Sequence, residues 1–327
     1  MRAFRFLTCL LCVSCGSFFG KPDDDDDDDD EEEDEESGTE TTVSDDDTGA
    51  TDDSGTTSGS PRFEEFVNIE EAYVGDASCY DGGAWLEQAA GSGCTVDQTL
   101  YGVVEDFQEG EPIGETTVDL YFRDDIGGSP SESFETTSDS EFIADVPVCE
   151  PIAYRTSTPV EWEQTKDTYR FHKVWGFDAD GDLEETLDSF SNETAAVITA
   201  LLGVNWDSST GLIAGMALGC DEDPIENVQV YIHDDAGQVP QELSVSYFVA
   251  GLPRSSQPAT SEDGLWIAVN VPPGTWTVAM WGFDGSDHTQ LGQAPVEVVA
   301  ASVHIANVYT GSGDGVWLPD SCLRSCN

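Results

Sequence analysis

Three aspartates around a glycine, in the run Asp178-Ala179-Asp180-Gly181-Asp182, are the residues of this chain best suited to chemistry. Alternating carboxylates on a turn offer the oxygen ligands that a hard cation such as calcium takes. The loop differs from an EF-hand because its glycine is misplaced and no glutamate stands at the twelfth position. Asp178, Asp180 and Asp182 are therefore a candidate calcium site. The alternative is an acidic turn between strands that simply faces water.

A second reactive position is a cysteine near the amino terminus. Arg2 and Arg5 precede a short apolar run that ends in Val13-Ser14-Cys15, a pattern typical of an export signal. The run is too short to span a bilayer. This triplet resembles the lipobox of bacterial lipoproteins, although Cys12 stands where leucine is commonest. The resemblance implies that Cys15 becomes the lipid-modified first residue and holds the protein on a membrane.

The remaining cysteines predict disulfides, since an even number in an exported protein favours disulfides over metal ligation. Six follow the signal: Cys79, Cys94, Cys149, Cys220, Cys322 and Cys326. Proximity in the sequence favours two local pairs, Cys79–Cys94 and Cys322–Cys326, and leaves Cys149–Cys220 by elimination. The alternative for the last two is a pair of buried free thiols.

The histidines do not predict a zinc enzyme. His172, His233, His288 and His304 form no HExxH or HxxE motif, and they fall on different predicted strands and loops. A catalytic zinc needs three protein ligands. The chain also lacks the G-x-S-x-G elbow and the Walker A and Rossmann glycine patterns. We therefore predict no catalytic site, and an enzyme would require a cleft with convergent titratable groups.

Tryptophan side chains are the remaining candidates for ligand contact, because their rings stack on sugars. Most of them lie within strand patterns, where core packing is the more common role. The tryptophans considered are Trp162, Trp175, Trp206, Trp266, Trp276, Trp281 and Trp317.

The charge of the chain limits its partners. The net charge is −56 over 327 residues, and residues 63–327 hold 47 Asp and Glu against seven Lys and Arg. Such a surface repels nucleic acid and anionic lipid heads, and it attracts divalent cations or basic partners. Adaptation to high salt is a second explanation, because salt screens repulsion between like charges.

The order of elements indicates an all-β protein on an acidic stalk. Residues 16–62 are low in apolar residues and cannot offset the entropy of ordering. Alternating apolar and polar residues then predict strands. The exception is a short helix from Glu193 to Leu202, with Ser191 or Asn192 as its cap and Gly203 as its stop.

An internal repeat organises the β region. The run Thr117–Asp125 aligns with Asn227–Asp235, and Leu100–Val104 aligns with Ile213–Ala217. A third block, Val174–Asp178, matches Met280–Asp284. Matching blocks in one order at a nearly fixed offset indicate two copies of one β domain.

The second copy resembles the carboxypeptidase regulatory-like domain, a transthyretin-like β-sandwich. The similarity rests on the opening strand Gly211–Ala217 with its continuation to Val230, the turn Thr260-Ser261-Glu262-Asp263-Gly264-Leu265-Trp266, and Val271-Pro272-Pro273-Gly274-Thr275-Trp276. Asp-Gly suits a tight hairpin turn, and Pro-Pro-Gly ends a strand. The resemblance implies accessory modules, which act as spacers, docking surfaces or sites of protein and glycan contact.

These observations predict two tandem transthyretin-like β-sandwiches with a short connecting helix, preceded by a disordered acidic tether. The predicted segments are a lipoprotein signal peptide (1–14), the tether (15–62), an irregular cysteine-containing opening segment (63–97), a first sandwich (98–182), a helical connector (183–210), a second sandwich (211–310) and a C-terminal tail (311–327).

The predicted function is non-enzymatic: an envelope lipoprotein, on the outer membrane because Gly16 rather than Asp follows Cys15. It would serve adhesion, scaffolding or contact with an envelope protein, with no cofactor. The alternative is a carbohydrate- or calcium-dependent binding module.

Overall fold

The computed structural model describes residues 68–80, 84–107, 110–159, 164–240 and 243–326. These residues form sixteen strands and a single α-helix, so the predicted all-β class is confirmed. The predicted signal peptide, Cys15 and the predicted acidic tether lie outside the described residues.

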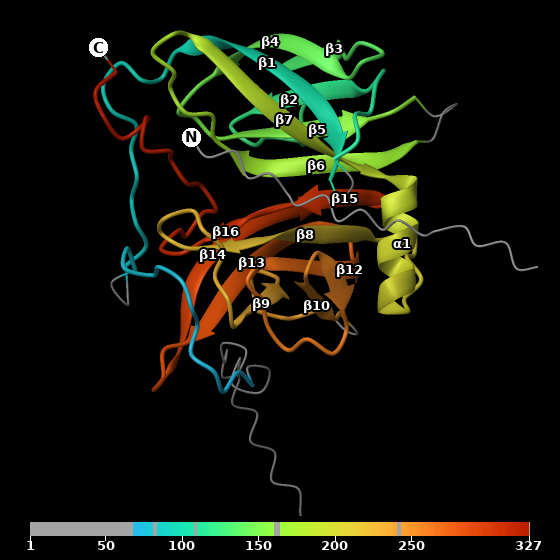
Figure 1. The fold of residues 1–327 in the computed structure, drawn as a ribbon, viewed down its shortest axis with the longest axis vertical. Coiled ribbons are helices and arrows are strands. Elements are labelled where there is room, and N and C mark those ends of the chain that lie inside the picture. Colours follow the sequence, from blue (N-terminus) through green and yellow to red (C-terminus); the bar gives the residue numbers. More distant parts are fainter. Residues whose placement is uncertain (1–67, 81–83, 108–109, 160–163, 241–242, 327) are drawn as a thin grey trace, which may run out of the picture. The chain divides into compact units, whose positions relative to one another are not determined.

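The first sandwich consists of two facing layers of strands (Figure 1). One layer has the order β3-β2-β5-β6, formed by Glu132–Glu135, Thr117–Phe122, Ile152–Ser157 and Thr165–Lys173. The other has the order β4-β1-β7, formed by Glu141–Pro147, Asp97–Asp106 and Asp182–Ser191.

The second sandwich also has two layers. One is β11-β10-β12-β8-β15, formed by Leu252–Arg254, Val245–Val249, Leu265–Val271, Gly211–Leu218 and Ser302–Ile305. The other is β9-β13-β14, formed by Val228–His233, Gly274–Phe283 and His288–Val298. A short strand, β16 (Val308–Tyr309), pairs with the end of β8.

The two sandwiches repeat one topology. β1 pairs antiparallel with β4 and parallel with β7, and β8 pairs in the same way with β12 and β15. β2 and β9 are likewise equivalent. β2 pairs antiparallel with β5 in the first sandwich, and β9 pairs antiparallel with β13 in the second. The first two matched blocks of sequence therefore fall on equivalent strands. The third match is wrong, because Trp175 follows β6 whereas Trp281 lies in β13, the counterpart of β5.

One glycine in each copy shows why the repeat is recognisable. Gly102 of β1 lies opposite Phe142, and Gly215 of β8 lies opposite Trp266. A Cβ atom on Gly102 would approach the Phe142 ring to 2.4 Å, and one on Gly215 would approach the Ala306 carbonyl oxygen to 1.9 Å. Each glycine thus makes room for a large ring or a neighbouring backbone.

Replacing Gly215 with alanine should lower the free energy of unfolding by about 2 kcal/mol, because overpacking against backbone cannot be relieved by a rotamer change. Urea denaturation measures the effect. Gly127→Ala is the control, since its nearest neighbour, an Asp125 side-chain oxygen, is 3.6 Å away. Equal stability of the two variants would contradict this account of β8.

Strand β15 joins the sandwiches into one continuous sheet. It lies between β6 of the first sandwich and β8 of the second, and it runs parallel to both (Figure 1). All four of its residues are buried. We call the three strands β6, β15 and β8 the seam.

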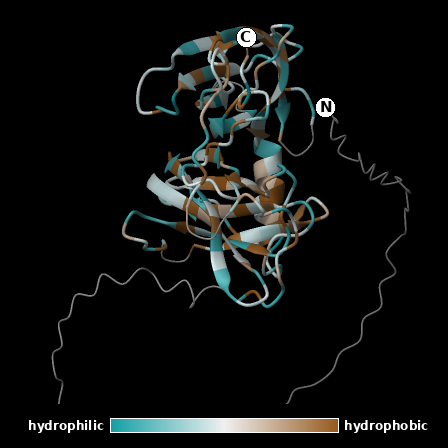
Figure 2. Ribbon diagram, turned by 90° about the vertical axis from the view of Figure 1, so that its left-hand side faces the viewer, coloured by the Kyte–Doolittle hydropathy of each residue, from teal (hydrophilic) through white to brown (hydrophobic). Residues whose placement is uncertain are grey.

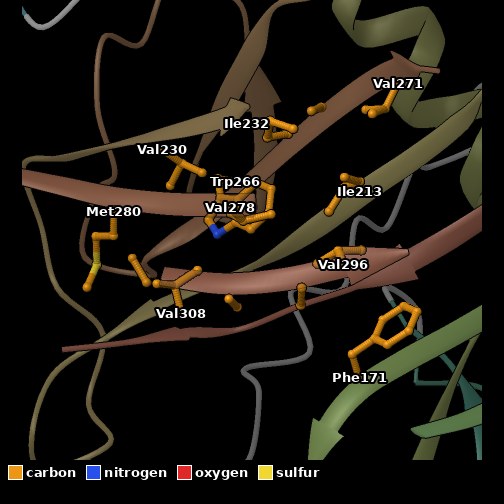
Figure 3. Close-up of a cluster of buried hydrophobic side chains, with 14 of the residues drawn as sticks. Phe171, Ile213, Val230, Ile232, Trp266, Val271, Val278, Met280, Val296 and Val308 are labelled. Carbon is orange, nitrogen blue, oxygen red and sulfur yellow. The ribbon is translucent and has the colours of Figure 1, made fainter. Parts of the chain in front are cut away.

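Apolar packing continues across the seam. The largest buried cluster contains Trp266, Val278 and Met280 of the second sandwich together with Phe171 of β6, which Figure 3 shows at the margin of the cluster. Figure 2 shows hydrophobic and hydrophilic residues following one another along the strands, as expected for sheets with one face in a core. The described residues accordingly group as one compact unit.

Helix α1 (Asn192–Leu202) follows the first sandwich. Ser191 is its N-cap and accepts a hydrogen bond from the Thr194 N–H at 3.0 Å, and Gly203 ends it at φ 68°. The predicted helix, cap and stop are therefore confirmed. The helical connector predicted for 183–210 is too long, because residues up to Ser191 belong to β7, which pairs with β1.

All six cysteines in the described residues form disulfides, but the predicted pairs are wrong. The bonds are Cys79–Cys220, Cys94–Cys326 and Cys149–Cys322, with sequence separations of 141, 232 and 173 residues. The opening segment reaches the second sandwich through the first bond. The C-terminal tail is joined to the opening segment by Cys94–Cys326 and to the first sandwich by Cys149–Cys322, so neither segment pairs within itself.

Candidate functional site

The three aspartates of the candidate calcium loop do not converge on one point in the structure. Asp178 lies between β6 and β7, and its carboxylate accepts a hydrogen bond from the Asp180 N–H at 2.7 Å. Its backbone is held by Gln98, whose side chain bonds the Asp178 N–H and carbonyl at 3.0 and 2.6 Å. Asp182 already belongs to β7. In the part of the chain that the structure describes, no three His, Cys, Asp or Glu side chains converge to hold a metal.

The four histidines also remain apart from one another. His233 Nδ1 contacts the carbonyl of Asp234 at 2.8 Å, and His288 Nε2 contacts that of Ile69 at 2.9 Å. The other two, His172 and His304, lie at the seam, where they fasten elements of both sandwiches.

His172 bridges the sandwiches through its two ring nitrogens. Nδ1 lies 2.8 Å from the Asp124 carboxylate in the first sandwich, and Nε2 lies 2.7 Å from the Pro295 carbonyl of β14 in the second. Burial by itself would lower the pKa of His172, but the hydrogen bond and charge of Asp124 outweigh it and raise the pKa above its usual value.

His304 occupies the middle of the seam and is fully buried. Its ring stacks on Tyr169 of β6 at 5.3 Å, and Nε2 accepts a hydrogen bond from the Val299 N–H at 3.0 Å. That bond leaves the proton on Nδ1, which has no hydrogen-bond partner among the described residues. Burial lowers the pKa of His304 to about 4, so the ring is neutral at pH 7.

A small hollow beside the seam gathers two of the few basic side chains. Its volume is about 90 Å³, and its lining includes Arg170, Lys173 and Glu222. Both cations are already paired: Arg170 lies 3.7 Å from Asp188, and Lys173 lies 3.0 Å from Glu185. Pockets for small molecules span roughly 300–1,000 Å³, so this hollow is too small for a sugar ring.

A larger hollow of about 480 Å³ opens at one end of the first sandwich. Its charged lining residues are Arg123, Asp97 and Glu150, and Phe122 and Val96 supply apolar surface. It contains none of the predicted site residues.

The tryptophans considered as candidates for sugar stacking are dispersed through the fold. Trp175 and Trp266 are buried, and Trp317 stacks on Tyr309 at 5.5 Å. Trp162 lies outside the described residues. An exposed tryptophan not considered from the sequence, Trp85, lies 5.9 Å from Tyr80.

The sequence did not point to the outer face of the β4-β1-β7 layer. Ile143 of β4 is 66% exposed and pairs with Tyr101 of β1, which is 41% exposed. Glu184 of β7 continues this row across the layer, because it pairs with Tyr101. Neighbouring rows on β4 carry Glu141 and Asp145, so an apolar pair lies within an acidic frame.

No helix among the described residues is long and apolar enough to cross a membrane.

The comparisons with known proteins find no family model and no curated protein that matches this chain. Among solved structures, the shaft pilin SpaA of Lactobacillus rhamnosus GG has 9% sequence identity and a TM-score of 0.23, over 66% of this chain and 98% of that one. The minor pilin GBS52 of Streptococcus agalactiae has 12% identity and a TM-score of 0.20, over 68% and 98%.

The TIE protein of Bacillus anthracis has 11% identity and a TM-score of 0.20 over 66% of this chain, which spans only 34% of that protein. Likenesses with such low TM-scores carry no argument about this chain. Its assignment as an all-β sandwich protein rests on its own strand pairing.

Proposed function

We propose that this chain is an exported, lipid-anchored envelope protein that presents two joined β-sandwiches for adhesion, scaffolding or protein contact. The observation that carries the proposal is the set of three disulfides between distant segments. Such bonds persist in oxidising compartments outside the cytosol, which agrees with the export signal that precedes Cys15. We assign the protein to the outer membrane because the residue after Cys15 is Gly16 and not an aspartate.

The joined sandwiches support a role as a rigid spacer or platform. The continuous sheet through β15 and the His172 bridge both resist movement of one sandwich against the other. Interfaces between independent domains allow motion by default, whereas a shared sheet and core do not. The acidic residues 16–62 would hold this unit away from the membrane by repulsion along the tether.

We further propose that both sandwiches are accessory modules of the carboxypeptidase regulatory-like kind. Two features of the second sandwich support this assignment. Gly264 takes a left-handed conformation, with φ 64°, in the turn before β12, and Pro272-Pro273 separates β12 from β13, which begins at Gly274.

Lipid anchoring predicts that Cys15→Ser abolishes both labelling with a fatty-acid analogue and recovery in the membrane fraction. Several acyl chains are needed for stable anchoring, and the modified cysteine would carry them. Cys12→Ser is the matched control, because it changes a cysteine of the same apolar run that the proposal leaves unmodified. The anchor would be refuted if the Cys15→Ser protein were still labelled and recovered in the membrane fraction. It would also be refuted if both variants lost labelling and membrane recovery to the same extent.

A further inference from the structure

Strand β4 has one open side. It pairs with β1 along its whole length, and no other strand in the described ranges pairs with its opposite edge (Figure 1). The Val104 N–H bonds the Ser140 carbonyl at 3.1 Å, and the Val148 N–H bonds the Val96 carbonyl at 3.0 Å. Antiparallel pairs alternate, so the backbone groups of Glu141, Ile143 and Asp145 point away from β1.

The ends of this edge are closed, which leaves a short open stretch. At one end Thr137 donates its N–H to the Glu141 carbonyl at 2.9 Å, and its hydroxyl accepts the Glu141 N–H at 3.1 Å. At the other end Pro147 has no N–H to offer. The N–H and carbonyl groups of Ile143 and Asp145 remain for a partner strand.

The side chain at the centre of this stretch favours pairing over protection. Proteins usually protect a sheet edge with charged side chains, proline or a bulge, and Glu141, Asp145 and Pro147 protect the two ends of this one. Here the central residue is Ile143, the most exposed large hydrophobic residue of the described chain, with exposed Tyr101 beside it. An added strand would place its own side chain beside Ile143 and so lengthen the row that Ile143 and Tyr101 form across the layer.

The charges around Ile143 select the partner. If a second copy paired antiparallel about Ile143, Glu141 would face Asp145, and a parallel copy would place each acid opposite itself. Like charges directly opposite each other are destabilising. The acidic tether of the chain would be repelled in the same way. A strand with lysine or arginine on both sides of an apolar residue would complement the edge in charge and in hydrogen bonding.

We propose that the edge of β4 at Ile143 and Asp145 binds an extended, basic segment of a partner protein as an added strand. This contact does not depend on the lipid anchor, and it specifies which surface of the first sandwich is used.

A synthetic peptide, acetyl-Thr-Lys-Thr-Val-Thr-Lys-Thr-amide, tests the proposal because its sequence reads the same in both directions. The full-length protein in detergent should raise the fluorescence anisotropy of the labelled peptide, and salt should weaken binding by screening the charges. A peptide with glutamate in place of lysine should not bind. Equal binding of the two peptides, or no binding at millimolar protein, would overturn the proposal.

Two variants separate strand pairing from simple charge attraction. Ile143→Pro removes an N–H that points to the open edge, and proline is tolerated on edge strands. It should weaken peptide binding about tenfold, because the peptide loses one hydrogen bond and also the contact with the Ile143 side chain. Ile143→Val keeps the N–H and the apolar side chain and should bind like the native protein. Equal affinities of the two variants would exclude strand addition.

Two further measurements complete the test. If Ile143→Pro fails to fold, a peptide N-methylated on its valine and both lysines blocks the same hydrogen bonds from the partner side and should not bind. Sedimentation of the native protein should show a monomer. Self-association that Ile143→Pro abolishes would identify the occupant as a second copy and contradict the basic partner.

Discussion

Replacing Cys149 and Cys322 with alanine should lower the free energy of unfolding by about 4 kcal/mol, the largest stability effect expected for this protein. The bond closes a loop of 173 residues, and a cross-link over such a loop removes much of the entropy of the unfolded chain. Both cysteines are buried in the core of the first sandwich, so that core also loses packing. Urea denaturation of the oxidised protein measures the loss.

The Cys94–Cys326 bond provides the comparison for this variant. Its own loop is longer, at 232 residues, but while Cys149–Cys322 is intact this bond restricts the unfolded chain further only through residues 94–149 and 322–326, and Cys326 is only partly buried. We expect Cys94→Ala/Cys326→Ala to be less destabilised than the Cys149–Cys322 variant. The opposite order would mean that the tail is held chiefly at its end and not where Cys322 enters the first core.

Acidification should weaken the seam through His304 by about 3 kcal/mol between pH 6.5 and pH 4. The folded state lowers the pKa of this ring from 6.5 to about 4, so the unfolded chain binds a proton more tightly over that interval. Stability therefore falls as the pH falls, because each tenfold difference in proton affinity between the two states corresponds to about 1.4 kcal/mol. Protonation would also require Nε2 to give up the Val299 N–H.

Other groups change with pH in the opposite direction, so the effect must be measured as a difference. Burial raises the pKa values of Asp188 and Glu222, and protonation of these carboxyls favours the folded state as the pH falls. The raised pKa of His172 makes the free energy of unfolding depend on pH only above pH 6.5, so it does not contribute to the change on acidification.

His304→Gln isolates the His304 contribution, because glutamine accepts a hydrogen bond without titrating. The advantage of the native protein over this variant should shrink by about 3 kcal/mol between pH 7 and pH 4. His233→Gln, at the half-buried end of β9, serves as the control. A constant difference at the two pH values would show that His304 does not couple the seam to pH.

Local signals in the sequence predicted local structure well. Ser191 and Gly203 delimit helix α1 because a hydroxyl cap and a left-handed glycine act within one turn of the helix. Gly264 adopts the positive φ expected of an Asp-Gly turn. The repeat identified equivalent strands where residues at matching positions have similar neighbours. Gly102 and Gly215 are an example, because each lies opposite a large aromatic ring.

Long-range structure was not predictable from the same signals. Proximity in sequence suggested Cys79–Cys94 and Cys322–Cys326, but no local pattern shows that the tail crosses back to the first sandwich. The four buried residues of β15 do not alternate, because this strand has neighbours on both edges and packing on both faces. The spacing of Asp178, Asp180 and Asp182 suggested a shared ligand, but it could not show that Gln98 holds the Asp178 backbone or that Asp182 begins β7.

The position of β15 in the chain also determines when the fold can be finished. Residues 302–305 follow β6 and β8 in the chain and are synthesised after them, yet their strand lies between the two in the interior of the larger sheet. Until they arrive, β6 and β8 each have an unsatisfied edge of the kind that promotes misassembly during folding. The surplus of acidic residues would keep such unfinished chains apart by mutual repulsion, and it would thereby protect the protein during the interval before the sheet closes.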